Sequence, residues 1–178
     1  LIEAVLAVRN IQRIQFYNRT YAKAVDFAQD VADRHPQVTI AVYDDVDAAM
    51  DDAEVIVTAT NASAPVFEKQ VEPGVHVNAV GSFKPDMQEL PSQLIANADK
   101  VVVEAAEAAL KETGDLINPV NEGVFNDTDL YGELGNIVAG KLTGRDSAEE
   151  ITVFKSVGLA IVDIVVANYF YQKLRASK

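Results

Sequence analysis

Short runs of β-branched and aromatic residues alternate with segments of helical periodicity through more than half of the chain. The runs predict strands at residues 13–17, 38–43, 55–60, 75–81 and 100–104. The segments between them predict helices, and the clearest of these spans residues 21–34. Strands and helices that alternate at this spacing favour an α/β fold built on a doubly wound parallel sheet. Right-handed crossovers place the carboxyl ends of all such strands at one edge of the sheet, and ligands bind at that edge.

The composition excludes several classes of function. The net charge of −12 gives a surface that repels nucleic-acid phosphates, so we expect no nucleic-acid partner. The chain has no cysteine, which rules out disulfides, thiolate metal ligands and cysteine nucleophiles and fits a cytoplasmic location. We also expect no membrane partner, because no uncharged apolar stretch is long enough to cross a bilayer and no signal-peptide pattern occurs. An acidic run at residues 44–54 lacks histidine, so we interpret it as a solvated surface and expect no metal site.

The first residues indicate that the chain belongs to a longer protein. Residues 1–9 already form an amphipathic helical pattern, with no capping residue before it. The first strand and the G-x-G-x-x-G turn of a Rossmann-type dinucleotide-binding domain would stand directly before such a helix. We therefore expect a Rossmann-type α/β domain that lacks its first strand and its glycine-rich turn.

The last residues form a different kind of segment. Residues 157–172 contain one charged residue, Asp163, and their helical pattern is apolar nearly all round. One face of a sheet cannot cover such a helix, so we expect it to pack against a missing domain or a second subunit. The residues at 147–150, Ser-Ala-Glu-Glu, match a helix-capping box. We accordingly divide the chain into a partial dinucleotide-binding domain, residues 1–145, and a C-terminal strand and helix segment, residues 146–178.

A short turn, Asn18-Arg19-Thr20, separates the first predicted strand from the helix at 21–34. At this point of a dinucleotide-binding sheet an acidic residue binds the ribose hydroxyls of NAD, whereas arginine accommodates the 2′-phosphate of NADP. The turn has no carboxylate, and the N-terminus of the following helix favours anions. We therefore favour NADP(H) over NAD(H), with Asn18, Arg19 and Thr20 as cofactor contacts. The alternative is that Asn18 or Thr20 only caps the helix.

Two further strand ends carry small residues at the expected ligand edge. They are Thr58-Ala59-Thr60 and Ala79-Val80-Gly81. Small side chains let a flat cofactor lie against the backbone, and a glycine that ends a buried strand permits close approach. Neither histidine has a serine or aspartate partner by spacing, so the catalytic residues remain unknown.

Several segments, in order along the chain, resemble the ornithine cyclodeaminase/mu-crystallin family. The matching segments are LIEAVLAVR at 1–9, YNRT at 17–20, VTAT at 57–60, HVNAVGS at 76–82, PDMQEL at 85–90, ETGDL at 112–116 and ITVFKSVG at 151–158. No single segment is decisive, but the ordered set is specific and extends over essentially the whole chain.

The resemblance implies a two-domain protein in which the present chain is the nicotinamide-binding domain. In that family the N-terminal half forms a homodimer and supplies the arginine and lysine that hold the substrate carboxylate. By position, the cofactor contacts would fall on the three short segments above and on Ser156, with Val157 and Gly158 near the substrate. The C-terminal helix would return to the other domain.

The reaction that the resemblance implies depends on residues 79–85. Ornithine cyclodeaminases look like A-V-G-G-D-x-P, whereas this sequence has Phe83 in place of the aspartate. Phenylalanine cannot transfer a proton, and losing a general acid or base costs about 10²–10⁴ in rate. We therefore favour the reductase branch, an NAD(P)H-dependent oxidoreductase acting on a small imino acid or, in reverse, on an amino acid. Three alternatives stay open: ornithine cyclodeaminase, a non-catalytic NADPH binder of mu-crystallin type, and a reductase resembling shikimate dehydrogenase, which the segment at 154–158 disfavours.

Overall fold

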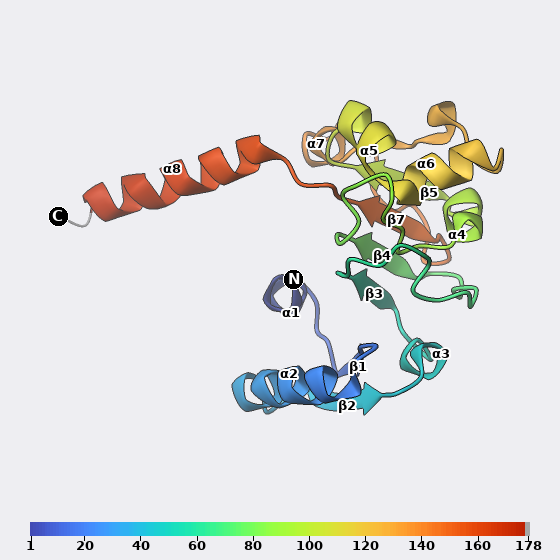
Figure 1. The fold of residues 1–178 in the computed structure, drawn as a ribbon. Coiled ribbons are helices and arrows are strands. Elements are labelled where there is room, and N and C mark those ends of the chain that lie inside the picture. Colours follow the sequence, from blue (N-terminus) through green and yellow to red (C-terminus); the bar gives the residue numbers. More distant parts are fainter. Residues whose placement is uncertain (177–178) are drawn as a thin grey trace.

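The computed structural model describes residues 1–176 and contains parallel β-sheets surrounded by helices (Figure 1). The strands are β1 (Arg13–Tyr17), β2 (Thr39–Tyr43), β3 (Val55–Thr58), β4 (His76–Ala79), β5 (Lys100–Val103), β6 (Gly132–Glu133) and β7 (Thr152–Lys155). The helices are α1 (Ile2–Val8), α2 (Tyr21–Arg34), α3 (Val46–Ala49), α4 (Ser92–Asn97), α5 (Ala106–Glu112), α6 (Gly114–Asn121), α7 (Leu134–Val138) and α8 (Ala160–Ala176), with a 3-10 turn at Asp127–Asp129. Because every strand pairing is parallel and helices connect most of the strands, the predicted Rossmann-type α/β class is confirmed.

The strands within residues 1–176 form two separate sheets. β1 pairs with β2, while the larger sheet has the order β3-β4-β7-β5-β6. β1 and β3 therefore each keep one edge without a strand partner in the described part of the chain. Figure 1 shows the small sheet set apart from the large one, with α3 between them in the chain.

β7 comes last along the chain but lies between β4 and β5, near the middle of the larger sheet. Residues 152–155 are therefore an integral part of that sheet. The capping box predicted at residues 147–150 is wrong, because no helix follows it. Instead the backbone N–H of Glu149 donates to Ser147 Oγ at 3.1 Å, in a turn that leads directly into β7.

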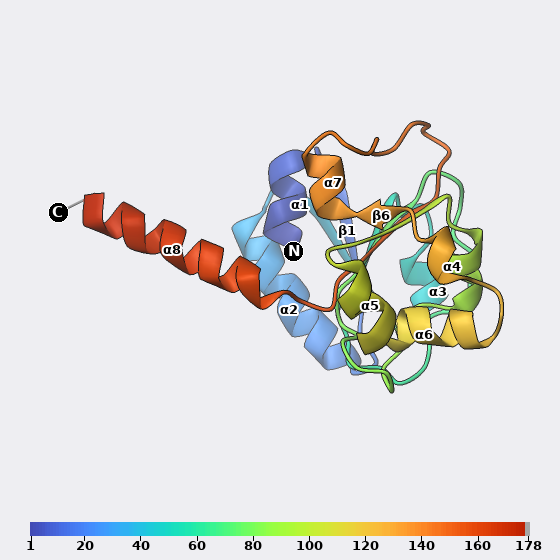
Figure 2. The same ribbon diagram turned by 90° about the horizontal axis from the view of Figure 1, so that it is seen from above.

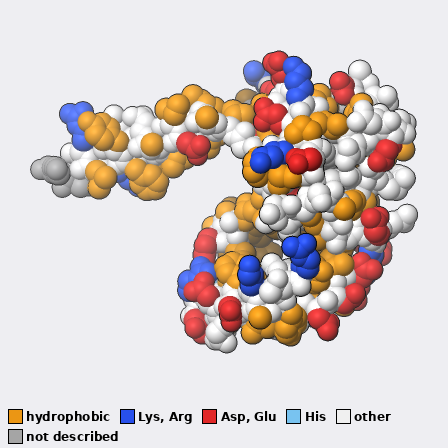
Figure 3. Space-filling view, in the orientation of Figure 1, with side chains coloured by type: hydrophobic (Ala, Val, Ile, Leu, Met, Phe, Trp, Pro, Cys, Tyr) orange, Lys and Arg blue, Asp and Glu red, His pale blue; other side chains and the backbone are white. Residues whose placement is uncertain are grey.

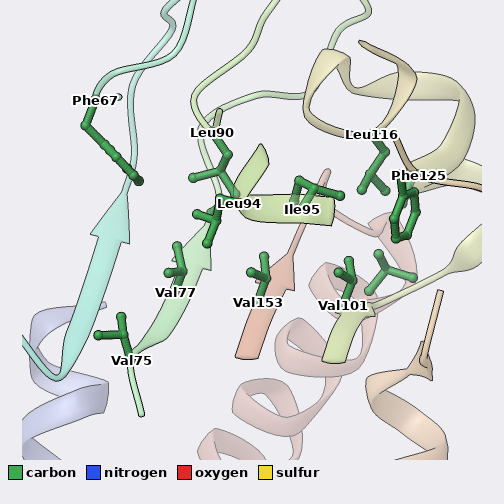
Figure 4. Close-up of a cluster of buried hydrophobic side chains, with 13 residues drawn as sticks. Phe67, Val75, Val77, Leu90, Leu94, Ile95, Val101, Leu116, Phe125 and Val153 are labelled. Atoms are coloured by element: carbon green, nitrogen blue, oxygen red, sulfur yellow. The ribbon is translucent and has the colours of Figure 1, made fainter. Parts of the chain in front are cut away.

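The main hydrophobic core lies on one face of the larger sheet (Figure 4). Alternate residues of three neighbouring strands point to this face, since side chains of a strand alternate between its two faces. They meet apolar side chains from the helices beyond: Val77 of β4, Val153 of β7 and Val101 of β5 against Leu94 and Ile95 of α4 and Leu116 of α6. The small sheet is covered separately by α2, whose buried Ala24, Ala28 and Val31 are spaced along one helix face.

The opposite face of the larger sheet is less well covered, and Val57 of β3 is 40% exposed. α8 extends away from the rest of the molecule, and within residues 160–176 none of its side chains is buried (Figures 1 and 2). Apolar side chains gather along it on the face seen in Figure 3. Among the described residues, no helix is long and apolar enough to cross a membrane. The less covered face of the larger sheet and the surface of α8 therefore both expose apolar area that a folded domain ordinarily buries.

Candidate functional site

The candidate site is the carboxyl edge of the larger sheet, where β3, β4 and β7 all end. Val80 N–H donates to Thr58 O at 2.9 Å, and Ser156 N–H donates to Ala79 O at 2.9 Å. These bonds continue the parallel register, in which Thr58 lies opposite Ala79 and Ala79 opposite Lys155. The structure thus brings together three of the predicted segments, namely residues 58–60, 79–81 and 156–158.

A buried carboxylate, Glu89, joins the ends of β3 and β4. Its Oε2 accepts hydrogen bonds from Thr58 Oγ1 at 3.0 Å, from Gly81 N–H at 2.8 Å and from Ser82 N–H at 3.2 Å. Its Oε1 accepts from Thr60 N–H at 2.5 Å. The side chain is 0% exposed, so these four donors replace the water that a carboxylate normally needs.

Gly81 has no space for a side chain. A Cβ built there would lie 2.1 Å from Thr60 O, 2.3 Å from Thr60 N and 2.4 Å from Glu89 Oε1. Most of these atoms belong to the backbone of the neighbouring strand end and cannot move aside cheaply. The close approach predicted for this glycine is therefore present, although the atoms that approach it belong to the protein itself.

A buried ion pair lies next to this edge and contacts the end of β4. Lys155, the last residue of β7, and Asp115 of α6 are both 0% exposed, and Lys155 Nζ lies 3.0 Å from Asp115 Oδ2. Lys155 Nζ also donates to Ala79 O at 3.2 Å. Asp115 Oδ1 accepts from the N–H groups of Glu89 at 2.6 Å and Leu90 at 2.9 Å. Burial raises the pKa of Asp115, while Lys155 and these two N–H groups oppose the rise. The pair thus links β7 to the segment that carries Glu89.

A second carboxylate, Glu104, follows β5 and organises the loop after β7. Its Oε1 accepts from Ser156 Oγ at 2.9 Å and from the N–H groups of Val157 and Gly158, each at 2.7 Å. Gly158 has φ +88°, a conformation that favours glycine, and this turn leads the chain toward α8. One carboxylate oxygen therefore sets the shape of the whole predicted substrate-proximal loop.

The turn at residues 18–20 lies elsewhere, at the carboxyl end of β1 in the small sheet. Asn18 Oδ1 accepts from Thr20 N–H at 2.8 Å, and Thr20 is the N-cap residue of α2 without a side-chain capping bond. Arg19 is exposed, and no hydrogen bond or ion pair within the described part of the chain engages its guanidinium. The capping alternative therefore accounts for Asn18 in part but leaves Arg19 available to a ligand.

Phe83 stands at the position where the resemblance to ornithine cyclodeaminases implies an aspartate. It follows the buried Ser82 at the carboxyl edge and is 50% exposed, with Lys84 Nζ 5.4 Å from its ring centroid. The edge thus presents an apolar ring at this position.

Four charged residues that organise the site were not assigned a role from the sequence: Glu89, Glu104, Asp115 and Lys155. Most of the residues that they contact lie far away in the sequence, for example 26 positions for Glu89 and Asp115 and 54 positions for Glu104 and Gly158. A pattern of neighbouring residues therefore cannot predict these contacts. The available signal was weaker: Lys155 ends an apolar strand, and a charged residue at such a position needs a buried partner.

The model of the ornithine cyclodeaminase/mu-crystallin family matches residues 1–178. A Delta(1)-pyrroline-2-carboxylate reductase of Bacillus cereus is 57% identical over 173 residues, which are 97% of this chain and 53% of that protein. The chain thus spans about half the length of the curated relatives it matches.

Two solved structures have the same fold. The Delta(1)-pyrroline-2-carboxylate reductase of Thermococcus litoralis, in complex with NADH and L-proline, matches with a TM-score of 0.94 and 35% identity, over 99% of this chain and 54% of that one. An archaeal alanine dehydrogenase dimer with bound NAD matches with a TM-score of 0.90 and 33% identity, over 99% of this chain and 53% of that one. The expectation drawn from the ordered sequence segments is confirmed: the chain belongs to the ornithine cyclodeaminase/mu-crystallin family.

Proposed function

We propose that this chain is the nicotinamide-binding part of an NAD(P)H-dependent reductase that acts on the C=N bond of a small imino acid, of the Δ1-pyrroline-2-carboxylate type. The observation that carries the proposal is the carboxyl edge, where the ends of β3, β4 and β7 meet and the exposed side chain at position 83 is an aromatic ring that cannot transfer a proton. The 57% identity to a reductase of that substrate supports the same reaction. When bound, the reduced nicotinamide supplies the hydride, and the protein orients the two reactants.

Particular residues would hold the cofactor and substrate. Residues 58–60 and 79–81 would contact the cofactor through backbone carbonyls and van der Waals surface, because Glu89 already occupies the N–H groups of Thr60 and Gly81. Ser156 would contact it through one oxygen lone pair, since its hydroxyl donates to Glu104 and also accepts from Gly158 N–H at 3.2 Å. Val157 and Gly158 would lie near the substrate. We assign no general acid or base among the described residues.

The test uses the full-length protein that contains this chain. NAD(P)H oxidation with Δ1-pyrroline-2-carboxylate, followed by absorbance, is the expected activity. Release of ammonia from ornithine without NAD(P)H consumption would instead establish the cyclodeaminase. Binding of NADPH without turnover of any imino acid in a panel would establish the non-catalytic binder.

We infer that the remainder of the protein completes the fold. A parallel strand between β1 and β3 would join the two sheets into one, in the order expected of a dinucleotide-binding domain. We propose that this domain extends past residue 145 to about residue 158, because β7 is paired with β4 and β5 in the sheet. α8 would pack on an N-terminal domain that provides the substrate site and the homodimer contact. The archaeal alanine dehydrogenase is a dimer, which supports the proposed homodimer, and the absence of cysteine fits a cytoplasmic protein.

Arg19→Asp tests the inferred preference for NADP(H). In the full-length protein we expect NADPH to bind about 100-fold more weakly, because a charge-assisted contact to the 2′-phosphate becomes a repulsion. NADH, which lacks that phosphate, should change by less than about threefold. Fluorescence titration gives both dissociation constants.

The control is Lys141→Asp, which makes the same charge change at an exposed position after α7. It should affect both cofactors slightly and equally through net charge alone. Equal weakening of NADPH and NADH by Arg19→Asp would contradict the 2′-phosphate contact.

A further inference from the structure

Glu89 is enclosed in a cradle of donors drawn from two strand ends. Its two oxygens accept hydrogen bonds from four donors: the hydroxyl of Thr58 and the backbone N–H groups of Thr60, Gly81 and Ser82. A fully buried carboxylate is costly unless such donors satisfy it. Once they do, each donor is also held in place by the carboxylate. Glu89 therefore determines how the backbone of both strand ends is turned.

The cradle accepts a carboxylate and excludes its amide counterpart. Both oxygens of Glu89 face N–H or O–H donors, and glutamine has an acceptor oxygen on only one side. With the amide nitrogen at the Oε1 position it would face Thr60 N–H, and at the Oε2 position it would face two N–H groups. In either orientation an amide N–H of glutamine faces a backbone N–H, and neither group has an acceptor. The ends of β3 and β4 would therefore have to shift to separate these donors.

The same backbone forms the surface that the cofactor would meet. A Cβ built at Gly81 would lie within 2.4 Å of Thr60 O, Thr60 N and Glu89 Oε1, so the two strand ends and the carboxylate pack closely there. Asp115 accepts hydrogen bonds from the backbone N–H groups of Glu89 and Leu90. Asp115 is in turn paired with Lys155 of β7, so a third strand also fixes the position of Glu89. A small displacement of Glu89 would therefore shift both cofactor-facing segments together.

We propose that Glu89 is a positioning residue for nicotinamide-cofactor binding, which it serves by fixing the carboxyl ends of β3 and β4. The inference rests on the proposed function of this edge. Glu89 has no exposed atom that a ligand could reach, so it acts only through Thr60, Gly81 and Ser82.

The experiment compares three variants of the full-length protein by fluorescence titration with NADH and NADPH. Glu89→Gln should weaken the binding of both cofactors at least about tenfold, because in either orientation the amide N–H groups oppose at least one of the four donors. Thr58→Val removes one donor at nearly constant shape and should weaken binding about threefold. Thr58→Ser keeps the hydroxyl that donates to Glu89 and should weaken binding less than Thr58→Val does.

Thermal unfolding separates positioning from a merely structural role. A structural role would lower the melting temperature of Glu89→Gln or Thr58→Val and leave the dissociation constant of the folded protein unchanged, and that result would overturn the proposal. Glu112→Gln, the same change at an exposed position ending α5, should alter neither quantity. If Glu89→Gln does not fold, the comparison of Thr58→Val with Thr58→Ser tests the proposal, through their dissociation constants for NADH and NADPH. If the wild type binds neither NADH nor NADPH, the proposed function itself fails, whereas wild-type binding with unchanged variants contradicts only the role of Glu89.

Discussion

Lys155→Met is expected to destabilise the protein by about 3–5 kcal/mol, because it leaves the carboxylate of Asp115 buried without its cation. Lys155 Nζ is 3.0 Å from Asp115 Oδ2, and both side chains are fully buried. Urea denaturation of the full-length protein, followed by circular dichroism, measures the loss. Lys141→Met is the matched control, since Lys141 is exposed, and it should change stability by less than about 0.5 kcal/mol.

The double variant Lys155→Met/Asp115→Asn shows whether the buried charge is the cause. Asparagine removes the charge and keeps an oxygen that accepts the N–H groups of Glu89 and Leu90. The double variant should therefore be more stable than Lys155→Met alone. A double variant that is less stable than the single one would contradict this account.

The loss from Lys155→Met should also depend on pH. Burial already raises the pKa of Asp115, and removing Lys155 takes away a contact that opposes the rise. A carboxyl whose folded-state pKa lies above its unfolded value binds a proton more readily in the folded state, so its cost to stability grows as pH rises through that window. The deficit relative to wild type should therefore be larger at about pH 7 than at about pH 5. An equal deficit at both would indicate lost packing instead of an unpaired charge.

Gly81→Ala should have the second large effect, on both stability and cofactor binding. The added Cβ would lie 2.1 Å from Thr60 O and 2.4 Å from Glu89 Oε1, so the ends of β3 and β4 must separate. Overpacking of this kind costs about 1–3 kcal/mol, and rigid backbone neighbours favour the upper end. NADH binding should weaken more than about tenfold, because both cofactor-facing segments move. Urea denaturation and fluorescence titration measure the two effects.

Gly135→Ala is the control for this substitution. Gly135 lies in α7, and a Cβ there would meet nothing within 4 Å. Alanine in a helix is favoured over glycine by about 0.5–1 kcal/mol, so this variant should be unchanged or slightly more stable. If Gly81→Ala behaved like Gly135→Ala, the strand ends would be more adaptable than their contacts indicate.

Local patterns located most of the strands and helices. The run at residues 13–17 and the helix at 21–34 match β1 and α2, because β-branched runs and helical spacing are properties of neighbouring residues. The alternation of strands and helices predicts a parallel sheet. A parallel sheet in turn predicts that ligands bind at the carboxyl edge. β7 was harder to place, because its position between β4 and β5 depends on pairing with strands more than 45 residues away.

The sequence by itself determined the fold class and the family, and it predicts which segments would approach a ligand, including Gly81 and the turn with Arg19. Each of these depends on residues close together in the chain or on their order along it. Only the tertiary structure showed which charged side chains organise the edge. Glu89, Glu104 and Lys155 look like ordinary charged residues in the sequence, because their donors and counterion are brought to them by distant strands and helices. A buried charge is tolerated only where such partners converge, and that convergence is a property of the folded chain.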